Sequence, residues 1–192
     1  MQAESDTTVS VVAGEGDGTL GTGSVVLIST SGTTVSQTGG WTYVARGVIS
    51  SVAPSQGQVG TWVTISGSRL LGAGNSIVQV QLGGVAVATI SNYSNSSVVV
   101  RAASSNTAGL GSAVLTADTG AVVSLANSWT YLTTGLVVAT TPNQGQVGTR
   151  VVLTGQRLLG GGSGLSSVTF GNVSCTIVYA NDSGTGAMAM RM

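Results

Sequence analysis

Residues 54–61 read PSQGQVGT, and residues 142–149 read PNQGQVGT. Two shorter segments recur at the same distance: RLLG at residues 69–72 and 157–160, and WTY at residues 41–43 and 129–131. The separations 142 − 54, 157 − 69 and 129 − 41 all equal 88 residues. A fixed period of this length indicates one structural unit that is used several times, so the chain is predicted to be a tandem array of small domains.

The sequence between these segments has the pattern of short β-strands. Val, Thr and Ser alternate, 42% of the residues are hydrophobic, and no stretch shows helical periodicity. Clusters of Gly, Asn and Ser separate the apolar stretches of the central repeat, which are residues 48–49, 59–65, 77–82, 85–90, 98–100, 113–116, 122–123 and 129–132. This spacing predicts an all-β fold built from antiparallel β-sandwiches.

The phase of the repeat divides the chain unevenly. Because WTY closes a unit and Pro142 lies near the start of one, we expect the second half of a domain at 1–44, a complete domain at 45–132 and the first part of a domain at 133–192. Residues 1–44 align with 89–132, and residues 135–192 align with 47–104 if two residues are inserted near Gly162. Two explanations stay open. Either these residues belong to a longer array, or the partial units of neighbouring chains complete each other by strand complementation.

The repeated motif resembles the opening of IPT/TIG domains. The pattern is Pro54-x-x-Gly57-x-x-Gly60-Thr61-x-Val63-Thr64-Ile65-x-Gly67-x-x-Leu70, followed by the hairpin Val80-x-Leu82-Gly83-Gly84 and the closing Trp129-Thr130-Tyr131. The resemblance implies tandem immunoglobulin-like sandwiches. The family occurs in plexin-type receptor ectodomains, microbial cell-surface proteins, some starch-active enzymes and Rel-type transcription factors, so it fixes the fold better than the function. Many extracellular versions carry a Cys after the Gly-Gly hairpin. Cys175 matches that position, whereas the central unit has Val87 there.

The composition excludes several classes of function. Charged residues form 6% of the chain, the formal net charge is zero, and all six basic residues are Arg. Phosphate binding rests on clustered Lys and Arg, so nucleic acid is excluded as a partner. The chain has no His for general-base chemistry or metal ligation. Its nearest acidic cluster, interpreted as solvated loop residues, is Glu4, Asp6, Glu15 and Asp17. We therefore predict no enzyme activity, no metal and no cofactor. No apolar run approaches the roughly 20 residues of a membrane helix.

Four Asn-x-Ser sequons stand in segments that we expect to be loops or strand edges. They begin at Asn92, Asn95, Asn172 and Asn181 and are candidate N-glycosylation sites. In a chain with so little charge, covalent glycans would provide the solubility that charged side chains normally provide. The sequons therefore predict a glycoprotein that is extracellular or lies at the cell surface.

Two further residues are candidates for an interface. Trp62 points away from Val63 and Ile65, toward the outside of its sheet, and Arg150 is its counterpart in the next repeat. An exposed Trp and an exposed Arg are typical of contact surfaces. Alternatively, a neighbouring loop partly covers Trp62, or its ring stacks against a sugar. The absence of Lys also leaves strand edges unguarded, which favours association between strands.

These observations lead to one favoured hypothesis and one alternative. The favoured function is a structural subunit of an extracellular, glycosylated filament or surface appendage. Its partners would be copies of itself, joined head-to-tail or side-by-side through strand complementation and contacts near Trp62. The alternative is an adhesin, a receptor-type ectodomain or a carbohydrate-binding module, whose partners would be glycans.

Overall fold

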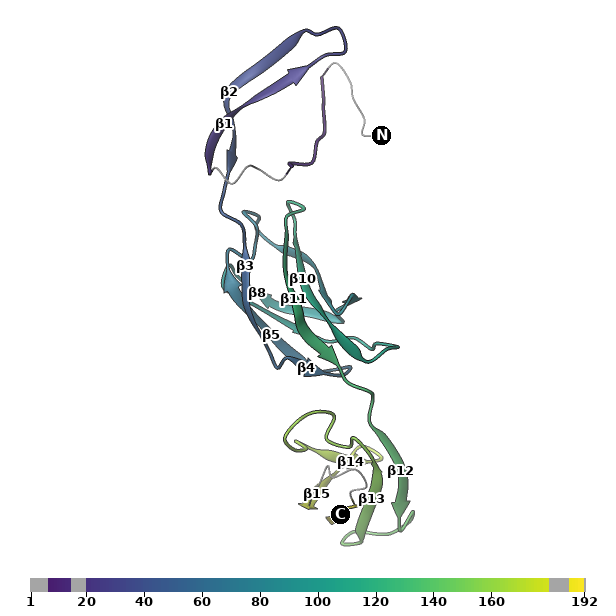
Figure 1. Ribbon diagram of the computed structural model, residues 1–192. Coiled ribbons are helices and arrows are strands. Elements are labelled where there is room, and N and C mark those ends of the chain that lie inside the picture. The colour runs from purple at the N-terminus through teal and green to yellow at the C-terminus, as the bar shows by residue number, and fades with distance from the viewer. Residues whose placement is uncertain (1–6, 15–19, 180–186, 192) are drawn as a thin grey trace. The chain divides into compact units, whose positions relative to one another are not determined.

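All regular structure that the computed structural model describes is β-strand, which confirms the predicted all-β class (Figure 1). The structure describes residues 7–14, 20–179 and 187–191. Asn181 and the acids at positions 4, 6, 15 and 17 lie outside these residues. The chain divides into two compact units, residues 1–46 and residues 47–192.

The first unit contains a β-hairpin. Strand β1 (Gly21–Ile28) pairs antiparallel with β2 (Thr34–Tyr43), and the register shifts once, at a bulge between Gly23 and Val25. The tip is a short turn in which the Ser29 N–H donates to the Thr33 carbonyl at 2.8 Å. In the described part of this unit, these two strands form a two-stranded sheet of their own.

The second unit begins with a sandwich of two sheets (Figure 1). One sheet has the order β3-β5-β9-β8, with bounds Val48–Ala53, Trp62–Ser68, Ser97–Arg101 and Thr89–Tyr93. The other has the order β4-β11-β10-β6-β7, with bounds Gln56–Gly57, Val122–Tyr131, Gly109–Ala117, Ile77–Leu82 and Val85–Ala86. Alternate side chains of both sheets point inward and form the core.

The core of this sandwich is centred on a large aromatic side chain. Trp129 is fully buried, and its ring meets the ring of Tyr131 edge-on, with centroids 5.4 Å apart and planes at 86°. Val63 and Ile65 from the opposite sheet are also fully buried, which confirms the alternation expected along their strand. Each large buried side chain contributes roughly 1.5–3 kcal/mol of hydrophobic stabilisation.

The second unit ends with a less complete arrangement. Its strands have the order β12-β13-β16-β15-β14, with bounds Leu136–Thr141, Arg150–Gln156, Ala187–Arg191, Val173–Tyr179 and Val168–Phe170. Only Val151 and Leu153 are buried among its described residues, with a few partly buried neighbours around them. We call these strands the C-terminal half-sandwich.

Strand registers correct the expected position of the insertion in this region. Phe170 pairs with Val173 as Leu82 pairs with Val85, so the 88-residue offset still holds there, after Gly162. Arg150 pairs with Arg191, whereas Trp62 pairs with Arg101, so the offset has become 191 − 101, or 90 residues. The two additional residues therefore lie between Val173 and Arg191, because the loop around Gly162 has the same length in both repeats.

The repeated PxQGQVGT segment forms the same tight turn twice. A Cβ placed on Gly57 would lie 2.5 Å from the Thr61 hydroxyl, and one on Gly145 would lie 2.6 Å from the Thr149 hydroxyl. The Thr61 hydroxyl also accepts a hydrogen bond from the Gln58 N–H at 3.1 Å. Gly is required at these positions because the backbone and the Thr side chain approach so closely.

Candidate assembly site

The β1–β2 hairpin repeats the β10–β11 hairpin of the central sandwich. Gly21 pairs with Tyr43, and the strands continue in register to Ile28 and Thr34. Gly109 likewise pairs with Tyr131, and the same pairing runs to Thr116 and Val122. Even the bulge occurs at the same place in both hairpins. The edge-on contact between Trp41 and Tyr43 also matches, with centroids 5.8 Å apart and planes at 82°. The first unit therefore presents one specific piece of a sandwich.

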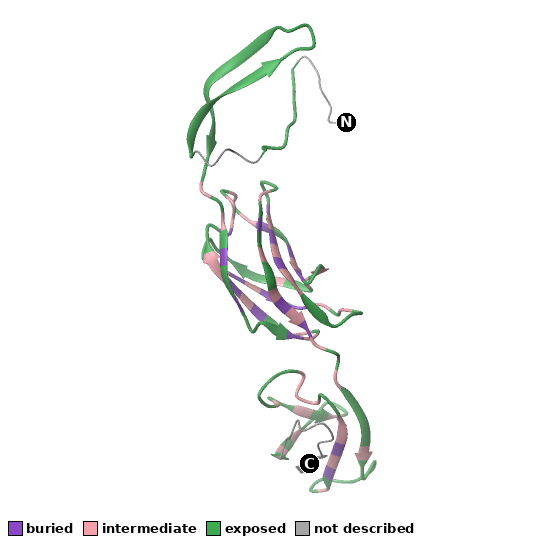
Figure 2. Ribbon diagram, viewed as in Figure 1, coloured by how far each residue is buried: buried purple, intermediate pink, exposed green. Residues whose placement is uncertain are grey.

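The two hairpins differ in what covers them. Figure 2 shows β1 and β2 exposed along their whole length, whereas buried residues line the central sheets. Trp41 is 47% exposed and Trp129 is 0% exposed, although they occupy equivalent positions. Three further apolar side chains of the hairpin are also exposed: Val25, Leu27 and Val35. We call these three residues, together with Trp41 and Tyr43, the uncovered face. Their equivalents in the central sandwich are buried: Ala113, Leu115 and Val123.

In the central sandwich, the end of β11 is held by the segment that follows Pro54. Strand β11 lies parallel to β4, and Thr130 is the register partner of Gln56. The Thr130 N–H donates to the Ser55 carbonyl at 2.8 Å, and the Leu132 N–H donates to the Gly57 carbonyl at 2.7 Å. The PxQGQVGT segment thus serves as the backbone docking edge for the closing WTY strand.

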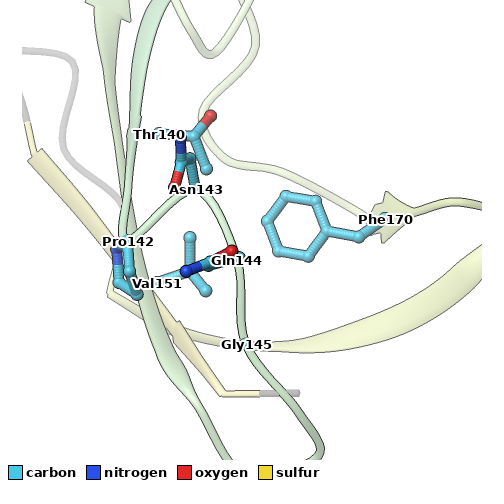
Figure 3. Close-up of a pocket in the computed structure, with 7 residues that line it drawn as sticks. All are labelled: Thr140, Pro142, Asn143, Gln144, Gly145, Val151 and Phe170. Carbon is cyan, nitrogen blue, oxygen red and sulfur yellow. The ribbon is translucent and has the colours of Figure 1, made fainter.

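The C-terminal half-sandwich has an open cavity at the corresponding place. Its volume is about 180 Å³, and the residues that line it are Thr140, Pro142, Asn143, Gln144, Gly145, Val151 and Phe170. Figure 3 shows the Phe170 ring pointing toward the Asn143–Gln144 segment, with Val151 beside it. At the 88-residue offset, Phe170 is equivalent to Leu82 and Val151 to Val63, and both Leu82 and Val63 are fully buried in the central sandwich. The cavity therefore occupies the position that the closing strand fills in the complete sandwich.

Glycine positions give an independent view of this difference. A Cβ on Gly83 would lie 3.3 Å from the Tyr131 ring and 3.7 Å from the Trp129 ring, so both aromatics pack against it. Gly171 is its equivalent and has nearly the same φ, 54° against 55°, yet a Cβ there would meet no described atom within 4 Å. The space that aromatic rings fill beside Gly83 is thus open beside Gly171.

The predicted interface residue Trp62 lies on the outer face of the first central sheet. Its side chain is 52% exposed, and the Arg101 guanidinium carbon lies 5.9 Å from the centre of its ring. Arg101 is the register partner of Trp62 on β9, and its Nε donates to the Gly60 carbonyl at 3.4 Å. The sequence analysis did not single out Arg101, since nothing in its spacing relates it to Trp62 before the strands are paired.

The remaining predicted site residues are distributed over the surface. Asn92 is exposed on β8, and Asn95 is exposed in the following turn, where its side-chain oxygen accepts a hydrogen bond from the Leu71 N–H at 3.3 Å. Asn172 is exposed at the turn between β14 and β15. Arg150 is exposed at the start of β13, and Cys175 is a partly buried free thiol. The structure does not bring these residues together.

Neither a metal site nor a membrane helix emerges from the described residues. They contain no group of three or more His, Cys, Asp or Glu side chains that could hold a metal ion. They also include no helix that is long and apolar enough to cross a membrane.

Comparison with known proteins identifies the class of this fold. The IPT/TIG domain family matches residues 48–131 and 136–187, so the chain belongs to the IPT/TIG family. No curated protein matches it in sequence.

Solved structures with a similar fold include the extracellular region of plexin A4 (TM-score 0.48, 20% identity, 76% of this chain and 15% of that one). Two others are an auxiliary nutrient binding protein from Bacteroides thetaiotaomicron (0.38, 21%, 48% and 22%) and a surface glycan-binding protein from Prevotella bryantii (0.38, 10%, 78% and 37%). The chain spans well under half the length of each.

Proposed function

We propose that this IPT/TIG chain is a non-catalytic structural module of an extracellular or cell-surface filament or appendage. In this role, copies of the chain complete each other's partial sandwiches. The observation that supports it is that the same chain carries an uncovered hairpin face, which includes Trp41, and an open cavity, which is lined by Phe170. In the central sandwich, the surfaces equivalent to these two lie together within one domain, which supports the proposal.

The energetics favour covering this face. Full burial of an exposed large apolar side chain is worth roughly 1.5–3 kcal/mol, and the five side chains of the uncovered face, which are 37% to 64% exposed, would each gain a part of that value. Association costs an estimated 4–15 kcal/mol in lost translational and rotational freedom, so the gain from burial exceeds that cost only if most of the face is covered. Because the hairpin and the cavity are different surfaces of one chain, their contact is heterologous, and repeating it gives an open fibre where the rotation between copies does not close into a ring.

Light scattering after size-exclusion chromatography, together with electron microscopy, tests this proposal. We expect species whose mass grows with concentration, and elongated particles at the highest concentrations. Trp41→Ala should shift the distribution to monomers. Val78→Ala is a matched control, because Val78 is also an exposed apolar residue but lies on the central sandwich. A chain that stays monomeric at every concentration would refute the assembly role.

Glycosylation is proposed as a second feature of this surface protein. Asn92, Asn95 and Asn172 are exposed in the structure and thus accessible to a glycosyltransferase. We expect enzymatic deglycosylation of protein from its natural source to lower the intact mass. An unchanged mass would show that none of these Asn residues, nor Asn181, carries a glycan, and that this weakly charged chain stays soluble without sugars.

The exposed Trp62 supports a second candidate function, which is binding of a glycan. An aromatic ring that lies on the outer face of a sheet beside an Arg offers both an apolar face and hydrogen-bond donors to a sugar ring. Affinity electrophoresis against a panel of polysaccharides tests this function. Retardation that Trp62→Ala abolishes and Val78→Ala preserves would support glycan binding, whereas equal mobility of all three proteins on every polysaccharide would exclude it.

A further inference from the structure

The geometry points to a specific occupant of the cavity in the C-terminal half-sandwich. We propose that it binds the Trp41-Thr42-Tyr43 strand from a second copy of this chain. This inference rests on the proposed function and deepens it, because it names the partner, the segment and the contacts. The occupant is an extended strand that carries two aromatic side chains, since the equivalent site of the central sandwich holds such a strand.

The backbone of the cavity offers the acceptors that this strand needs. In the central sandwich, the carbonyls of Ser55 and Gly57 accept from the N–H groups of Thr130 and Leu132. Their equivalents across the proposed contact are Asn143 and Gly145 as acceptors, with Thr42 and Val44 as donors. Strand addition of this kind takes its affinity from main-chain hydrogen bonds and its specificity from pockets for side chains.

Phe170 and Gly171 shape the pocket for the aromatic side chains. Leu82 is the register partner of Ala113 in the central sandwich, so Phe170 would lie opposite Val25. Tyr131 and Trp129 pack against Gly83, so Tyr43 and Trp41 would fill the open space beside Gly171.

A second glycine contact makes the match sharper. A Cβ on Gly111 would lie only 2.5 Å from the α-carbon of Gly83, so the two backbones touch at the end of the β6–β10 pairing, within one sheet. The equivalent pair is Gly23 on the hairpin and Gly171 beside the cavity. A Cβ on either of them meets no described atom within 4 Å. The chain thus keeps, at both surfaces, the small residue that close approach requires.

Disulfide trapping tests the proposed register directly. Neighbouring strands lie about 4.8 Å apart, which is within the α-carbon separation that a disulfide spans. In a Cys175→Ser background, the pair Thr42→Cys and Gln144→Cys should give a ladder of linked chains on a non-reducing gel. The matched control is Gln56→Cys with Thr130→Cys, because these residues are the equivalents of Gln144 and Thr42 and are register partners within one sandwich. That pair should close within a single chain.

The outcomes separate this inference from the broader proposal. A ladder supports the assigned contact. A Thr42–Gln144 link within one chain overturns the second copy as occupant. If the chain self-associates and the control pair closes, but no ladder forms, the assigned contact is wrong and the assembly role stands. If the chain is monomeric and no ladder forms, both fail.

Substitution of Gly23 provides a second test that leaves the free chain intact. Gly23→Val adds a side chain that has open space in the isolated hairpin but would collide with Gly171 in the complex. We expect loss of the ladder and of larger species, with an unchanged thermal transition of the central sandwich. Gly111→Val, in contrast, should disrupt the central sandwich itself. Undiminished assembly of the Gly23→Val chain would overturn the inference.

Discussion

Trp41 and Trp129 occupy the same position of the same hairpin, yet solvent reaches one and not the other. Removing a buried Trp leaves a large cavity, so we expect Trp129→Ala to destabilise the central sandwich by about 3–5 kcal/mol. Trp41→Ala should change the unfolding free energy of the free chain by at most about 0.5 kcal/mol. Urea unfolding monitored by circular dichroism measures both values. Equal destabilisation would show that the first hairpin is already covered.

Tyr131 makes a prediction about alkaline pH. Burial raises the pKa of its phenol above the ordinary value of 10.0, so the fold favours the neutral form. The folded state therefore holds the phenol proton more tightly than the unfolded state does. The resulting contribution to the free energy of unfolding is complete below the ordinary pKa and is lost as the pH rises through the raised pKa of the folded state. We expect the melting temperature to fall above about pH 10, and Tyr131→Phe to reduce this fall. Thermal melts between neutral and alkaline pH test it.

The same hydroxyl affects stability at neutral pH. The Tyr131 oxygen is buried and has no hydrogen-bond partner among the described residues. An unsatisfied buried polar group costs about 1–3 kcal/mol, so Tyr131→Phe should stabilise the sandwich by about 1 kcal/mol. Destabilisation at neutral pH would indicate that water or another group satisfies the hydroxyl.

At the scale of elements, one carboxylate fastens two loops of the central sandwich. Asp118, at the end of β10, accepts from the Asn75 N–H at 3.1 Å and from the Ser76 hydroxyl at 3.1 Å, in the loop before β6. Asp118→Ala removes these bonds, and because the site is exposed we expect a loss of about 1 kcal/mol. Asp118→Asn keeps one acceptor oxygen and should lose less. Chemical denaturation of both variants checks this order.

Strand boundaries show how far the apolar pattern could be followed. The stretch predicted from Val59 begins instead at Trp62, because the Thr61 N–H closes a turn onto the Gln58 carbonyl. Two predicted stretches, 122–123 and 129–132, are joined into the single strand β11. The apolar pattern is interrupted between them, because the register shifts at a bulge between Leu125 and Trp129 that contains Asn127, with φ of 52°. A single predicted stretch, 85–90, is divided between β7 and β8.

The candidate site was only partly predictable for a related reason. Repeat spacing alone predicted partial units at residues 1–44 and 133–192. It could not reveal the cavity beside Phe170, because the lining residues come from three strands and a turn that meet only after folding. Arg101 was missed for the same reason: its position beside Trp62 depends on the pairing of β5 with β9. Repeats reveal equivalence, whereas contacts require register.

At the scale of the whole molecule, the low charge makes a prediction about salt. In the proposed assembly, a chain with 6% charged residues and zero formal net charge would associate through apolar contacts and main-chain hydrogen bonds. Because few charge–charge interactions would hold the copies together, screening by salt has little effect on them. We expect the assembly constant to change less than about threefold between low and high sodium chloride. Sulfate, which strengthens apolar burial, should promote assembly. Analytical ultracentrifugation in these salts measures the effect, and strong dissociation by sodium chloride would contradict an apolar interface.

The uncovered hairpin has one more consequence. A row of such subunits would always leave a bare Trp41 strand at one tip and a vacant Phe170 hollow at the other, so the two tips would be chemically distinct and the row would have a direction. A copy without residues 1–46 could join only through its hollow. It would then present no free strand to the next subunit, and would stop growth of the fibre at that tip.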